Sequence, residues 1–152
     1  MSEKIETMKA FTRLAISRLE DEAGGLTEEV LGWRACEEAN SVRWILTHTA
    51  QLGNVFICKV LRGDWDYWPE GWPRDYVDNR SYSLGRIMGD LKKGSELFLE
   101  ALDQLTAEKL AEEIPFGGGR PREYAVMFLI SEIIHHEGQL AQALGTIRRQ
   151  VG

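Results

Sequence analysis

The stretch that decides the fold is FLISEIIHHEGQLAQALGTIRRQ, residues 128–150, near the end of the chain. Its apolar residues recur at steps of three and four, which is the period of an amphipathic helix. On a helical wheel centred on Leu129, residues within about 60° form one apolar stripe: Val126, Ile133, His136, Leu140, Leu144 and Ile147. His135 falls about 120° from the same reference, beyond the edge of the stripe. The run therefore predicts a long helix on which His136, and not His135, faces the core.

Two segments in the first half of the chain have the same helical period. The first is predicted over 2–22, ahead of an Ala-Gly-Gly stop, and its recurring apolar residues are Ile5, Met8, Phe11, Leu14 and Leu19. The second is predicted over 41–62, with Asn40 or Ser41 as its cap and Gly63 as its stop. On this helix the spacing places His48 on one stripe with Ile45 and Leu52.

Two further helices are predicted in the second half. One covers 83–105, with Ser83 as its cap. A short helical turn and a glycine-rich loop follow it. The last helix should carry Pro121 in its first turn, where a missing N–H costs least, and should run to about residue 149. These elements predict an all-α fold, a four-helix bundle with long connecting loops and a single domain over 1–152.

The segment GDWDYWPEGWPRDYVDNRSY, residues 63–82, has no period and is rich in turn formers. It is predicted to be a long ordered loop, which leaves open whether the helices simply alternate in direction. Its Trp65, Trp68 and Trp72 should be covered, either by packing over the end of the bundle or at the mouth of a site that takes an apolar group. Trp33 and Trp44, outside this loop, are expected in the core.

Composition narrows the classes of partner. The chain of 152 residues has 43% hydrophobic and 28% charged residues and a net charge of -6, typical of an ordinary globular protein. No basic cluster favours nucleic-acid binding, and no apolar run reaches the roughly 18 residues of a membrane span. The N-terminus lacks a signal-peptide core, so a cytoplasmic protein is expected. Cys36 and Cys58 are isolated and are expected to be partly buried small hydrophobes.

Three side chains are candidates for chemistry. Glu132 precedes His136 by one helical turn and flanks the same stripe, while His48 lies on the inner face of another helix. Two imidazoles and a carboxylate that converge from facing helices are typical of metal sites in helix bundles. Three ligands with one position left for water would make a catalytic site. The alternative is that the histidines are hydrogen-bonded core residues and that Glu132 with His136 is a structural pair.

Two motifs carry a family resemblance. LTEEVLGWRACEEANSVRWILTHTAQLGNVF, residues 26–56, resembles the DinB-like family, whose second helix carries a metal-binding histidine in a W-(I/L)-L-x-H setting, here Trp44 to His48. FLISEIIHHEGQLAQAL, residues 128–144, resembles the last-helix signature of that family, in which two metal-binding histidines four residues apart precede x-G-Q. His48 then matches the first ligand and His136 the last. The middle ligand falls on Glu132, where the family usually has histidine.

The resemblance implies a bundle that pairs into homodimers and holds a divalent ion between its helices. Zinc or nickel are the favoured ions, with iron and manganese as further candidates, and His135 and Gln139 are expected to support the ligands or contact a small-molecule substrate. Known members of the superfamily attach low-molecular-weight thiols to electrophiles or act as isomerases and hydrolases. The alternative function is a non-catalytic or inactive bundle that serves as a ligand-binding or stress-related dimer.

Overall fold

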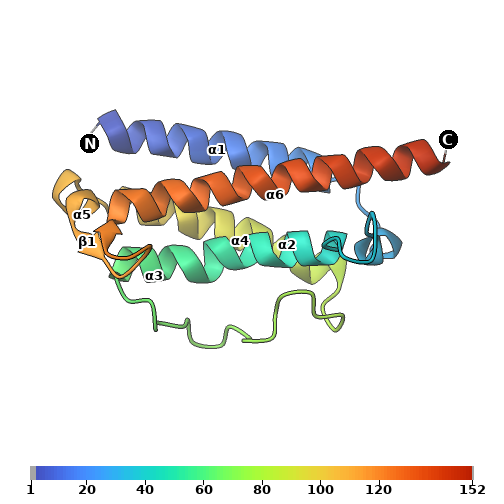
Figure 1. Cartoon of the computed structure of the whole chain (residues 1–152), viewed down its shortest axis with the longest axis horizontal. Coiled ribbons are helices and arrows are strands. Elements are labelled where there is room, and N and C mark those ends of the chain that lie inside the picture. Colours follow the sequence, from blue (N-terminus) through green and yellow to red (C-terminus); the bar gives the residue numbers. More distant parts are fainter. Residues whose placement is uncertain (1–2, 152) are drawn as a thin grey trace.

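Four long helical segments lie side by side in the computed structural model, which describes residues 3–151 (Figure 1). The segments are α1 (Glu3–Ala23), a rod formed by α2 (Val42–Gln51), η2 (Leu52–Phe56) and α3 (Ile57–Arg62), then α4 (Leu84–Asp103) and α6 (Arg122–Val151). The shorter elements are η1 (Glu28–Gly32), α5 (Ala107–Ala111), β1 (Glu113–Ile114) and β2 (Arg120–Pro121). The predicted all-α bundle is confirmed, with a two-stranded antiparallel hairpin added in the glycine-rich segment.

The helices do not simply alternate in direction. Lys4 pairs with Glu123 and Arg18 with Glu137, so α1 and α6 run parallel. The α2–α3 rod and α4 also run parallel to each other, because the 63–83 connection returns along the length of the bundle before α4 begins (Figure 1). The long loop that the sequence predicted is therefore what sets the topology.

Local chemistry explains where the helices begin and end. The Oγ of Ser41 accepts a hydrogen bond from the Trp44 N–H, and the Oγ of Ser83 accepts one from the Arg86 N–H, as N-caps do. Gly63 ends α3 with a φ of 68°, a left-handed conformation that favours glycine. Pro121 was expected inside the last helix. It lies instead in β2 opposite Glu113, one residue before α6, because the hairpin takes up this part of the chain.

The rod meets α4 at a close backbone contact. A Cβ on Gly53 would lie 2.4 Å from the carbonyl oxygen of Gly94, and a Cβ on Gly94 would lie 2.7 Å from the Asn54 amide nitrogen. Neither position can therefore carry a larger residue without a shift of its neighbours. Beside this contact the Asn54 amide donates to the carbonyl oxygens of Ala50 and Asp90. The contact falls in η2, a single π-helical stretch of the kind that often lies near functional sites. The contact between Gly53 and Gly94 fixes the part of the rod after His48 against α4.

The loop over 63–82 runs along the flank of the rod (Figure 1). Tyr76 anchors it: the side chain is fully buried, and its hydroxyl donates to Asp90 at 2.8 Å. Burial and this carboxylate raise the pKa of the Tyr76 hydroxyl. Trp65, Trp68 and Trp72 are partly buried, as expected. Trp65 packs against the core and lines a hollow next to His48 and Glu132.

Some residues are more exposed than their apolar character predicts. Phe11 and Leu14 are 49% and 55% exposed, because the buried stripe of α1 instead contains Ile5, Met8, Thr12, Ala15, Ile16 and Leu19. Trp33 and Trp44 are half-buried, whereas both were expected in the core. Cys58 is half-buried as expected, but Cys36 is exposed. Within the described residues, no helix is long and apolar enough to cross a membrane.

Candidate metal centre

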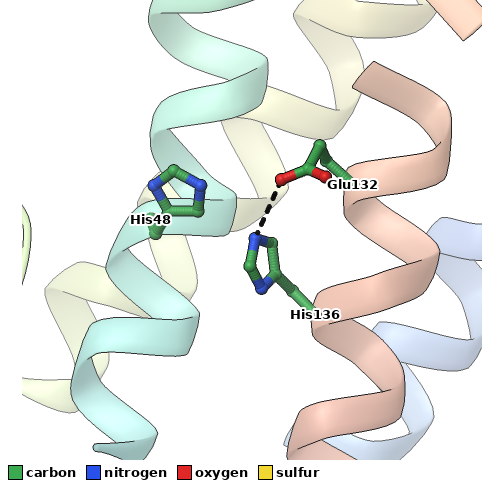
Figure 2. Close-up of side chains that lie close together, drawn as sticks. All are labelled: His48, Glu132 and His136. Carbon is green, nitrogen blue, oxygen red and sulfur yellow. Dashed lines mark ion pairs between the residues drawn. The ribbon is translucent and has the colours of Figure 1, made fainter. Parts of the chain in front are cut away.

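Two facing helical segments bring His48, Glu132 and His136 together (Figure 2). His48 comes from α2, and Glu132 and His136 come from successive turns of α6. One donor atom from each residue lies within 4.8 Å of the others, and the Nε2 of His136 is 3.4 Å from a carboxylate oxygen of Glu132. The three side chains that the sequence selected therefore converge between the helices.

His136 presents to this group a ring nitrogen that makes no hydrogen bond. Its side chain is buried, with 4% of the residue exposed, and its Nδ1 is 2.9 Å from the amide oxygen of Gln139. An amide oxygen accepts hydrogen bonds, so the neutral His136 tautomer that suits this contact has its proton on Nδ1 and a lone pair on Nε2. Among the described residues, this buried Nε2 has no hydrogen-bond partner. A buried nitrogen of this kind is costly unless something binds it.

The His48 ring packs against two neighbouring rings, those of Trp44 and His136. Its ring stacks on Trp44 at 4.6 Å between centroids, and it meets the edge of the His136 ring at 4.7 Å. Burial, followed by the positive charge that His136 would carry, lowers the pKa of His48 to about 4, although Glu132 acts in the opposite direction. His48 is therefore neutral near pH 7, which is the form that binds metals.

The donor set fits a divalent cation. Two neutral imidazoles and a carboxylate are common ligands of zinc and of other first-row divalent metals. Ligands at about 2.1 Å from a tetrahedral ion lie about 3.4 Å apart, by the geometry of a tetrahedron. The separation of 3.4 Å between His136 Nε2 and the Glu132 oxygen equals this spacing. The Glu132 side chain is 27% exposed, so the group is accessible from one side.

Gln139 and His135 were expected to support the ligands or contact a substrate, and the structure places them differently. Gln139 contacts His136 directly, as described above. His135 is exposed, and although its ring is 5.0 Å from that of His136, it lies outside the cluster of donors. The structure thus places one of the two predicted supporting residues behind a candidate ligand and leaves the other at the surface.

Two neighbours of the site were not predicted from the sequence. Glu137 is buried and pairs with Arg18 of α1 at 3.0 Å, which ties the α6 turn that bears His136 to α1. Its position off the apolar stripe gave no sign of burial. Trp44 was assigned to the core, although it precedes His48 by one helical turn, and that spacing was a signal that the two side chains meet.

Comparison with known proteins identifies the family. A family model described as the DinB superfamily matches residues 12–140. The chain belongs to the DinB superfamily. This finding confirms the resemblance seen in the two histidine motifs. No curated protein matches the chain.

Solved structures show the same fold at low sequence identity. A DinB-like protein from Bacillus subtilis matches with a TM-score of 0.74 and 15% identity, over 93% of this chain and 92% of that one. A conserved protein from Enterococcus faecalis matches with a TM-score of 0.70 and 18% identity, over 94% of this chain and 95% of that one. At such identities the likeness concerns the fold alone.

Proposed function

We propose that this DinB-superfamily protein binds one divalent metal ion through His48, Glu132 and His136, with zinc or nickel favoured over iron or manganese. The observation that carries the proposal is the buried Nε2 of His136, which makes no hydrogen bond and faces the other two donors, with the Glu132 carboxylate 3.4 Å away. Two ligands at about 2.1 Å from one ion can be at most about 4.2 Å apart. Donor separations of up to 4.8 Å therefore require small side-chain rotations on binding.

The reaction that we propose is the transfer of a low-molecular-weight thiol to an electrophile. A bound divalent ion would lower the pKa of a thiol or water and so supply a nucleophile near neutral pH. In the overall reaction the thiol loses its proton to solvent, a sulfur–carbon bond forms, and the leaving group departs with its electron pair. Gln139 would hold the His136 ring in the correct tautomer, and Trp44 would orient His48.

An activity screen tests this reaction. Metal-loaded and chelator-treated protein would be incubated with small thiols and an activated aryl halide, and adduct formation would be followed by absorbance. The proposal expects turnover that the chelator removes, that added metal restores and that His136→Ala lacks. His135→Ala is the matched control, because His135 is an exposed histidine next to the site. Metal binding without turnover of any thiol would favour the non-catalytic ligand-binding alternative.

We also propose that the protein forms a homodimer through α1 and α6. Phe11 and Met127 line one surface hollow of about 460 Å³, and they are 49% and 44% exposed. Leu14 and Ile134, also exposed, follow on the same two helices. Exposed apolar side chains grouped in this way are typical of protein interfaces. Light scattering after size exclusion should give twice the chain mass, and Phe11→Glu should shift the protein to the monomer.

A further inference from the structure

A second hollow adjoins the candidate metal centre and is almost entirely apolar. It has a volume of about 100 Å³, and its lining includes His48 and Glu132. The other lining residues are Leu52, Phe56, Trp65, Phe116, Phe128 and Leu129. Apolar cavities of ~150 Å³ are known to take up benzene. The hollow has about two thirds of that volume and is open on one side, so it can take part of an aromatic ring or a smaller apolar group next to the three candidate metal ligands.

Its wall is a chain of aromatic rings from separate parts of the fold. Phe56 and Trp65 lie 5.8 Å apart between centroids, Trp65 and Phe116 4.8 Å, and Phe116 and Phe128 5.4 Å. Phe56 comes from η2, Trp65 from the 63–82 loop, Phe116 from the hairpin and Phe128 from α6. Phe128 remains 40% exposed. Phe128 therefore stands at the open side of the hollow, with one part of its ring in the lining and another part in water.

Contacts behind the wall hold it in place. The buried Lys59 ammonium donates to the carbonyl oxygen of Trp65 at 2.6 Å and lies 5.5 Å from the centre of the Trp65 ring. The Phe116 N–H donates to the Ile114 carbonyl oxygen, and the Phe116 carbonyl oxygen accepts from the Arg120 N–H. A ligand would therefore find the wall already formed and would not have to order it.

We infer that this hollow binds an uncharged aromatic group of the substrate while a polar atom of the same molecule reaches His48, Glu132 and His136. The inference rests on the proposed metal-binding function and names its substrate class. Besides the candidate metal ligands, the only side-chain polar group among the lining residues is the Trp65 indole N–H, which can donate one hydrogen bond and accept none. A charged group would therefore lose most of its hydration there without compensation. Aromatic rings, in contrast, pack edge to face against such walls.

The first test compares two metal-binding probes that differ in one group. Zinc-loaded protein would be titrated with acetohydroxamate and benzohydroxamate by calorimetry. The phenyl ring should tighten binding by about tenfold, from burial of roughly 60 Å² more apolar surface. Phe128→Ser should remove most of this advantage, whereas Val151→Ala, an exposed apolar position on the same helix but outside the hollow, should keep it. Equal binding of both probes to a zinc-loaded wild type would overturn the inference and leave the metal site intact.

A second test needs no metal. Metal-free protein would be titrated with toluene while the indole N–H signals of its tryptophans are followed by NMR. The Trp65 signal should move in the wild type and stay in place in Phe128→Trp, in which a larger ring fills the hollow. The absence of any change at Trp65 would overturn the inference. Failure to load zinc would instead remove the proposed function, and the toluene result would still decide whether the hollow accepts an aromatic ring.

Discussion

The Nδ1 of His136 lies 2.9 Å from the side-chain oxygen of Gln139, three residues further along α6. Both residues belong to one helix, so the contact is built into its geometry. It favours the neutral tautomer with the proton on Nδ1, in which the lone pair of Nε2 faces Glu132 and His48. The glutamine of the x-G-Q motif thus has a structural role, because it orients the His136 ring.

This contact predicts that Gln139 supports metal affinity without touching the ion. Gln139→Ala should weaken zinc binding by about 10- to 100-fold, as the loss of such supporting hydrogen bonds does in other metal sites. The dissociation constant from a competition titration with a chelating dye measures this. Gln142→Ala, three residues further on in α6, should bind as the wild type does. Equal affinity for Gln139→Ala and wild type would show that the hydrogen bond has no part in metal binding.

Glu132 is predicted to be the third ligand, in the place where the family usually has histidine. Glu132→Ala should lower zinc affinity strongly, because the ion loses a charged ligand. Glu132→His should bind zinc and nickel at least as tightly as the wild type and should bind manganese more weakly, since manganese prefers oxygen ligands. Parallel titrations with the three ions measure the order. An Ala variant that binds as well as the wild type would exclude Glu132 from the site.

Stability of the metal-free protein should depend on pH through His48. The pKa of this side chain is about 4 in the folded protein, below the ordinary value of 6.5. Between these values the unfolded chain binds a proton that the folded protein does not, so the free energy of unfolding rises with pH from about 4 to 6.5 and this contribution is constant above. Urea unfolding of wild type and His48→Phe across this range measures it. The slope should be shallower in the variant, and equal slopes would contradict the assignment.

The close contact between the rod and α4 is predicted to tolerate no side chain. Gly53→Ala would place a methyl group 2.4 Å from the carbonyl oxygen of Gly94, and neither backbone can yield without moving a helix. Roughly 3 kcal/mol of destabilisation is expected, at the upper end of the range for overpacking. Gly89→Ala is the matched control, because an added Cβ meets nothing within 4 Å there and alanine favours the helix. Chemical denaturation of both variants measures the difference, and a stable Gly53→Ala would show that the helices can separate.

Periodicity in the sequence was enough to find the helices and the three converging side chains, because His48 and His136 lie on apolar stripes that must face inward. It was not enough to orient α4, since the direction depends on how the 63–82 loop returns, and Tyr76 and Lys59 determine that through tertiary contacts. Phe11 was misplaced for a related reason. Phe11 follows Met8 by three residues, a spacing that places both on one side of the helix. The packing of the neighbouring helices decides how wide the buried stripe is, and Phe11 lies outside it.

Metal binding by isothermal titration calorimetry, on protein purified without a histidine tag and stripped by a chelator, is the most direct measurement. We predict one zinc or nickel ion per chain for the wild type and for His135→Ala, and no specific binding for His48→Ala or His136→Ala. Circular dichroism would establish that each variant is folded. A wild-type stoichiometry near zero, or metal binding that survives in both folded ligand variants, would contradict a metal centre at His48, Glu132 and His136.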